Sequence, residues 1–211
     1  MAIRPVAALL SVFAFEACAH ERVLEPAAGA SLAPGRQDVA EAVVAGVTLE
    51  VSGDSWQGDP QNLGSLFTPV RVTLRNESGK ALRVSYQDFK LSGASGTEYA
   101  AMTPDEARGS LAVAPQSPYA GFERDPMGVM GPRPIDDAYY GSSPERLPTP
   151  DMLSQALPEG MVQDGEDVTG FLYFPSVTGT EHAVELDMTL SDATDGQAFG
   201  RIAIPFQTSE R

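Results

Sequence analysis

The stretch Thr68-Pro-Val-Arg-Val-Thr-Leu-Arg75 alternates apolar and polar residues with a period of two. Successive side chains of a β-strand point to opposite faces of the sheet, so Val70, Val72 and Leu74 share one face. The polar residues between them then face solvent, and the turn-rich segment 76–80 that follows reverses the chain. This pattern predicts a half-buried strand in an antiparallel sheet.

Short runs of the same kind recur along the chain and are separated by turn residues. A change of parity after Tyr86 predicts a bend or bulge near Gln87 and Asp88, and Asp195-Gly196 is a hairpin signal. Such short strands, with few helical segments between them, predict an all-β fold, an antiparallel sandwich of two sheets. The expected strands are 47–51, 68–75, 82–91 with the bend, 97–101, 167–177, 182–190 and 198–206.

The last three of these strands carry more detailed expectations. Segment 168–177 is almost continuously apolar, which predicts burial on both faces or a cover supplied by the insertion described below. In 182–190 the polar residues Glu185, Asp187 and Thr189 are expected to face water. Pro205 has no backbone N–H, so we expect it at the edge of a sheet.

Segment 103–160 interrupts the strand pattern and holds ten of the 17 prolines. Because proline removes hydrogen-bond donors, we expect a long Pro/Gly-rich insertion with short helices at 104–111 and 151–157. So long a connection within a domain is usually either functional or disordered. Its aromatic and methionine side chains either pack over a sheet edge or contact a partner. The candidate binding residues are Tyr119, Phe122, Met127, Met130, Tyr139 and Tyr140.

The N-terminus has the order of an export signal: Arg4, an apolar run over 6–15, and small residues around Cys18. The run is shorter than the roughly 20 residues that a transmembrane helix needs. The Ala-Cys pair resembles the lipobox of bacterial lipoproteins, which implies a signal peptide over 1–17 and a lipid-modified Cys18. Two alternatives stay open. Cleavage after Ala19 would release a secreted chain, and an uncleaved N-terminus would be a buried helix of a cytosolic protein.

The residues that follow Cys18 are rich in Ala, Gly and Pro and show no hydrophobic period over 25–35. This composition predicts a flexible tether over 18–45, with a helical turn or two at 38–45. The remaining 46–211 is expected as one β-sandwich domain that contains the insertion at 103–160. A tether of this kind would hold the folded domain clear of the membrane that carries its lipid anchor. The expected location is the bacterial cell envelope, with the anchor in the outer membrane or facing the periplasm.

The net charge limits which partners the protein can bind, and the cysteine count limits how the fold is stabilised. The formal net charge is -15, with 29 acidic against 14 basic residues. An acidic surface repels polyanions, so we expect no nucleic-acid partner. The single cysteine leaves no intramolecular disulfide, and the stability of the fold must come from its core.

Reactive side chains form no recognisable catalytic pattern. His20 and His182 lack the neighbours needed for a zinc site or a catalytic dyad. The acidic turns at 164–167 and 192–195 offer oxygen ligands that calcium prefers, yet neither matches an EF-hand loop. The adjacent pair Asp136-Asp137 lies on a loop and is expected to face solvent. We therefore expect a protein that is not an enzyme and that has no cofactor and no metal site.

Three motifs carry a resemblance to a known family. They are Val70-Arg-Val-Thr-Leu-Arg-Asn76, Asp88-Phe-Lys-Leu91 before Gly96-Thr-Glu-Tyr99, and Asp164-Gly-Glu-Asp-Val-Thr-Gly-Phe-Leu-Tyr-Phe174. Together they resemble the immunoglobulin-like (telokin-like) extracellular domain of bacterial lipoproteins of unknown function. The resemblance covers about half of the expected mature chain and implies an immunoglobulin-like sandwich. That family has no shared catalytic residues, so it implies no active site here.

Three functions remain open on the sequence. The first is a cell-envelope lipoprotein whose immunoglobulin-like scaffold serves binding or assembly, anchored in the membrane at Cys18 and contacting an envelope protein through the 103–160 insertion. The second is a secreted or structural accessory protein without a discrete ligand. The third is a hydrolase, which would need a cleft where acidic groups of the insertion meet the sheet.

Overall fold

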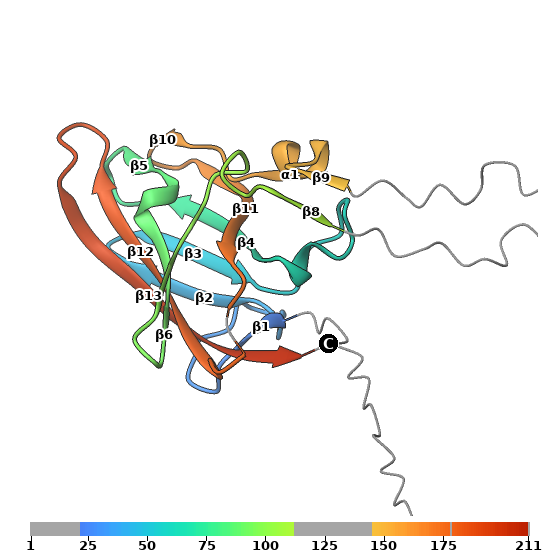
Figure 1. Ribbon diagram of the computed structural model, residues 1–211. Coiled ribbons are helices and arrows are strands. Elements are labelled where there is room, and N and C mark those ends of the chain that lie inside the picture. Colours follow the sequence, from blue (N-terminus) through green and yellow to red (C-terminus); the bar gives the residue numbers. More distant parts are fainter. Residues whose placement is uncertain (1–21, 112–144, 178, 211) are drawn as a thin grey trace, which may run out of the picture.

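The computed structural model describes residues 22–111, 145–177 and 179–210. The fold is mostly β, with two antiparallel sheets that face each other across a hydrophobic core (Figure 1). The first, sheet A, contains β1 (Arg22–Pro26), β13 (Ala198–Glu210), β12 (Ala183–Asp192), β5 (Leu82–Val84), β10 (Gly160–Val162), β6 (Phe89–Gly93) and β7 (Glu98–Ala100). The second, sheet B, has the order β11 (Asp167–Pro175), β4 (Phe67–Asn76), β3 (Val47–Ser52) and β2 (Ala40–Val44).

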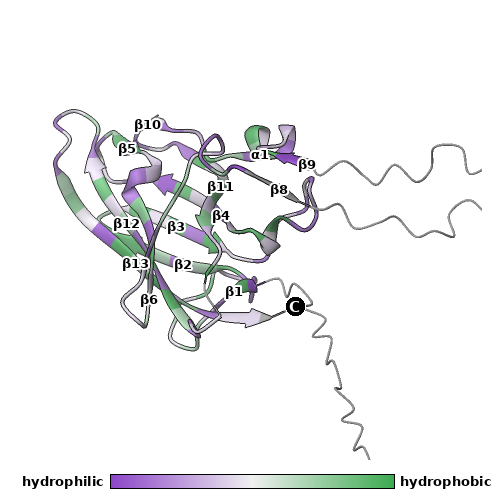
Figure 2. Ribbon diagram, viewed as in Figure 1, coloured by the Kyte–Doolittle hydropathy of each residue, from purple (hydrophilic) through white to green (hydrophobic). Residues whose placement is uncertain are grey.

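The strand that decided the fold class behaves as its sequence predicts. In β4, Val70, Val72 and Leu74 are fully buried, while Arg71 and Arg75 are exposed. The same alternation runs along β12 and β13, visible as hydrophobic and hydrophilic bands in Figure 2. Facing apolar rows of the two sheets make the main core, so the all-β expectation is confirmed.

The predicted break near Gln87 is a short 3-10 helix, η2 (Tyr86–Asp88), which separates β5 from β6. Both strands pair with β12, so the 3-10 turn interrupts one continuous strand position in sheet A. A capping box holds it: the Ser85 side chain accepts from the backbone of Asp88, and the Asp88 carboxylate accepts from the backbone N–H of Ser85. The local signal for the bend was therefore correct.

The N-terminal part of the described chain differs from the expected tether. Residues 22–26 form β1, which pairs with β13 along its whole length, and Val23 and Leu24 are buried. Residues 40–44 form β2 in place of the expected helical turn over 38–45, pairing with β3. The expectation was wrong because both strands are stabilised by partners distant in sequence, which composition does not reveal.

The insertion is built differently from the expectation at its start and as expected at its end. Within 104–111 there is no helix; β8 (Gly109–Leu111) pairs there with β9 (Glu145–Leu147) in a separate two-stranded sheet. At the other end, α1 (Pro150–Gln155) lies within a residue or two of the expected helix. The Thr149 side chain caps this helix by accepting from the backbone N–H of Met152 at 3.2 Å.

Two side chains depart from their expected surroundings. Asp187 is buried on the outer side of sheet A, because Arg201 on β13 and Ser92 on β6 cover it and hydrogen-bond its carboxylate. Pro205 lies in β13, which runs between β1 and β12 and is not an edge strand. Its position is tolerated because β1 stops pairing one residue away, where Pro26 lies opposite Phe206.

Among the helices that the structure describes, none has the length and apolar content to cross a membrane.

Candidate functional site

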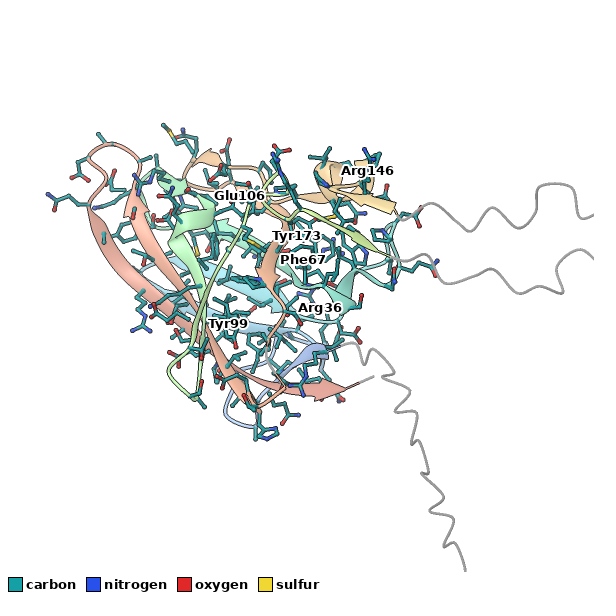
Figure 3. All side chains as sticks on the ribbon, in the orientation of Figure 1. Arg36, Phe67, Tyr99, Glu106, Arg146 and Tyr173 are labelled. Carbon is teal, nitrogen blue, oxygen red and sulfur yellow. The ribbon has the colours of Figure 1, made fainter. Side chains whose placement is uncertain are left out.

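A second hydrophobic cluster lies on the outer face of sheet B. The register places Phe171 of β11 opposite Arg71 of β4, so Phe171 and Tyr173 project from the face that the β4 sequence left to solvent. Segments from before β4 and from both ends of the insertion pack against these two rings, and Figure 3 labels Tyr173 and Phe67 among the side chains of this group. We call this group the outer cluster: Leu63, Phe67, Ala107, Leu147, Met152, Phe171 and Tyr173, all buried.

Trp56, which the sequence placed in a loop outside the strand pattern, completes the outer cluster. Its ring meets Phe171 edge-on at a centroid distance of 5.1 Å and Tyr173 at 6.1 Å. Its indole N–H donates to the carbonyl of Pro60 at 2.9 Å, which satisfies the one polar atom of the ring. The tryptophan therefore anchors the loop before β4 on the outer face of sheet B.

The two ends of the insertion are fastened to the free edge of β11. At the start of the insertion, Met102 forms a bridge with Tyr173, and the Met102 N–H donates to the Tyr173 carbonyl at 2.8 Å. At its end, the Leu157 N–H donates to the Phe171 carbonyl at 2.9 Å. The Tyr173 hydroxyl donates to the carbonyl of Met152 at 2.9 Å, and burial raises the pKa of this tyrosine above its ordinary value. The outer face of β11 is therefore covered by residues from both ends of segment 103–160, together with Trp56 and Leu63.

We call the segment that follows α1, residues 156–160, the insertion arm. Tyr86, a residue of the main core, also binds this arm. The Tyr86 hydroxyl donates to the Leu157 carbonyl at 2.9 Å. The Glu159 carboxylate accepts from the Tyr86 backbone N–H at 2.9 Å and from the Ser85 hydroxyl at 2.7 Å. Burial, with a smaller contribution from the charge of Glu159, raises the pKa of Tyr86 to about 12. The arm that follows α1 is thus held to both sheets.

The β8–β9 ladder forms a stem that leaves the outer cluster at Leu147, and residues 112–144 join its two strands. The six candidate binding residues fall within that segment and lie outside the described residues, as does the pair Asp136-Asp137. Cys18 and His20 also lie outside the described residues. What the structure does place is the base of the insertion, which the outer cluster fixes to sheet B.

A shallow groove of about 240 Å³ lies beside the outer cluster on the same face of sheet B. Its floor comes from outward residues of β3 and β4, and its walls from the loops before β2 and after β3. Across the floor, Arg71 pairs in register with Ser52, and Thr73 with Glu50. Sequence analysis missed this groove because its residues come from three separated segments. The lining side chains are Arg36, Asp38, Val39, Glu50, Val51, Ser52, Ser55, Arg71 and Thr73.

The acidic turns considered for calcium use their carboxylates to hold the backbone. Asp164 accepts from the N–H of Gly79 at 2.8 Å, and Asp195 accepts from the N–H of Gln197 at 2.9 Å. Asp192 accepts from the N–H of Thr194, which keeps the pKa of that carboxyl below its ordinary value. No group of three or more metal-ligating side chains occurs in the part of the chain that the structure describes. His182 is exposed immediately before β12.

No protein-family model matches this chain, and neither the curated proteins nor the solved structures contain a match to it.

Proposed function

We propose that this protein is a non-enzymatic, lipid-anchored scaffold of the bacterial cell envelope. Its immunoglobulin-like sandwich would present the 103–160 insertion to an envelope protein. The observation that carries this proposal is the outer cluster, which fixes both ends of the insertion to one face of sheet B. A rigid base under a long connecting segment is an arrangement typical of binding loops on β scaffolds.

The position of β1 supports attachment at Cys18. Only three residues separate Cys18 from Arg22, where β1 begins. Four residue steps span at most about 14 Å, so a lipid on Cys18 would hold the sandwich directly at the membrane surface. In this arrangement the anchor is shorter than the tether that composition predicted.

The insertion base lies on the same side of the molecule as β1, the first described strand after Cys18 (Figure 1). β1 contacts the 3-10 helix η1 (Leu63–Ser65), and Leu63 belongs to the outer cluster together with Leu147 of β9. The stem would therefore be close to the membrane, where a partner would also be anchored or peripheral. This geometry favours binding or assembly at the envelope over the alternative of a secreted protein without a ligand.

The role of the insertion can be tested without disturbing the sandwich. Leu111 and Glu145 are direct partners in the β8–β9 ladder. Residues 112–144 can therefore be replaced by Asn-Gly, which closes a two-residue hairpin in the favoured turn type. We expect the intact chain to form a specific cross-linked complex in living cells, and the shortened chain to lose it while staying in the membrane fraction.

A matched control is the substitution Met161→Ser, which removes an exposed apolar side chain on β10, away from the stem. We expect this variant to cross-link as the intact chain does. Cross-links that persist after replacement of 112–144, or that are lost equally with Met161→Ser, would contradict a role for the insertion in partner binding.

A further inference from the structure

The groove on sheet B holds an arginine, Arg71, that has no carboxylate partner among the residues the structure describes. Arg71 is exposed on β4, and no described residue gives its guanidinium a hydrogen bond or an ion pair. By contrast, ion pairs with carboxylates engage the described bases Arg36, Lys80, Arg83, Lys90 and Arg201.

The side chains that line the groove with Arg71 determine which kind of ligand can bind there. The second arginine of the groove, Arg36, is engaged by the carboxylate of Glu50. Hydroxyl groups line the same groove: Ser55 donates to the Ser52 carbonyl at 3.5 Å, and Thr73 shares a hydrogen bond of 3.0 Å with Thr169. The groove therefore offers one uncommitted planar cation among hydroxyl oxygens, with Asp38 at its wall.

We propose that this groove binds a small ligand through its carboxylate group, with Arg71 as the recognising residue. The guanidinium fork matches the two oxygens of a carboxylate, which allows a bidentate pair. The groove has two basic and two acidic side chains, so a single negative charge suits it better than the multiple charge of phosphate.

The size of the groove sets the scale of the ligand. Its volume equals the share of about eight water molecules in the liquid. This is below the roughly 300 Å³ at which pockets for drug-sized molecules begin. An N-acylated amino acid or the C-terminal residue of a peptide has the required carboxylate and fits this class. The site lies on sheet B outside the insertion, so it would operate independently of the proposed partner contact.

The proposal is tested by NMR titration of the isotopically labelled full chain. The probes are N-acetylalanine, N-acetylalaninamide, which differs only in lacking the carboxylate, and inorganic phosphate. We expect saturable shifts of the Ser52, Ser55 and Thr73 amide signals with N-acetylalanine alone. Arg71→Gln should weaken this binding about tenfold or more, the usual effect of losing a charged hydrogen bond.

Arg75→Gln is the matched control. Arg75 is also exposed on β4, faces the same way and lies outside the groove, so its replacement should leave binding unchanged. Because both arginines are exposed, both variants are expected to keep the amide spectrum of the parent chain. The proposal is overturned if no probe gives saturable shifts, if the acid and the amide bind alike, if phosphate binds as tightly as the acid, or if both variants weaken binding equally.

Discussion

Asn76, at the end of β4, shows how a single buried polar residue joins several loops. Its side-chain N–H groups donate to the carbonyls of Lys80 at 2.7 Å and Val162 at 2.9 Å. Its side-chain oxygen accepts from the Ser78 backbone N–H at 3.1 Å and from the Ser78 hydroxyl at 2.7 Å. The residue is fully buried, so these bonds replace all the water it would otherwise bind.

Asn76→Ala should therefore lower the free energy of unfolding by about 3 kcal/mol, because buried partners are left unsatisfied at about 1–3 kcal/mol each. Urea denaturation measures the change. Ser78→Ala, which removes only a half-buried partner of the same amide, should cost no more than about 1 kcal/mol. Equal effects of the two substitutions would show that Asn76 does not organise this end of the sheet.

The raised pKa of Tyr86 leads us to expect that the protein loses stability at alkaline pH. Its pKa is raised from 10.0 to about 12 in the folded state, so the unfolded chain releases the phenol proton first. The contribution of Tyr86 is therefore fully present below pH 10 and is lost as the pH rises toward about 12. Denaturation curves at several alkaline pH values should show this fall, and Tyr86→Phe should make it shallower without removing it, since the pKa of Tyr173 is raised as well. A pH dependence unchanged by Tyr86→Phe would contradict this account.

The burial of Asp187 could not be predicted from the sequence. The alternation of β12 correctly assigned it to the outer side of sheet A. Its burial there depends on Arg201, whose Nε donates to the Asp187 carboxylate at 2.8 Å from the neighbouring strand. Strand periodicity assigns a face, but it does not say which long side chains of other strands cover that face.

At the scale of elements, Gly170 tests the fastening of the insertion arm. A Cβ at this position of β11 would lie 2.4 Å from the Cα of Leu157, which is backbone and cannot yield easily. Gly170→Ala should separate the arm from β11 and cost about 1–3 kcal/mol, as overpacking usually does. Urea denaturation and faster proteolysis at 156–160 should report it.

Gly29→Ala is the control for this substitution, because a Cβ at position 29 meets nothing within 4 Å. It should leave both the stability and the proteolysis pattern unchanged. If Gly170→Ala behaves like Gly29→Ala, the arm does not pack on β11 as described.

The elements that could be predicted from sequence are those with a long local period. β3, β4, β11, β12 and β13 each contain enough alternating or continuous apolar residues to be recognised. The short strands β5, β6 and β7 were predicted as parts of the apolar segments 82–91 and 97–101. β1, β2, β8, β9 and β10 were not predicted, because these short strands show little periodicity and depend on partners elsewhere in the chain. α1 was recognised from its Thr-Pro-Asp start, which is a local capping signal.

The whole molecule depends on its N-terminal strand, and truncation measures that dependence. A chain lacking residues 1–21 retains β1, whereas one lacking 1–26 loses the buried Val23 and Leu24 and leaves β13 unpaired on one side. Burial of each side chain is worth about 1.5–3 kcal/mol, so the second truncation should lower the free energy of unfolding by about 3 kcal/mol or more relative to the first. Equal stability of the two chains would show that residues 22–26 behave as a flexible tether and that β1 does not stabilise the fold.

Neither candidate site could be predicted at this scale. The outer cluster joins residues from the loop before β4, from β11 and from both ends of the insertion, and the groove joins three other segments. Contacts of this kind are set by how the sheets and loops assemble. The sequence indicated that β11 is either buried on both faces or covered by the insertion. It did not indicate that Arg71 has no carboxylate partner among the described residues.

The central claim is that this scaffold is held at the membrane by a lipid on Cys18. The most direct measurement is the intact mass of the protein purified from the envelope of cells that make it. The account predicts a chain that begins at Cys18 and carries the added mass of acyl groups. An unmodified chain that begins at His20, or one that still begins at Met1, would contradict it.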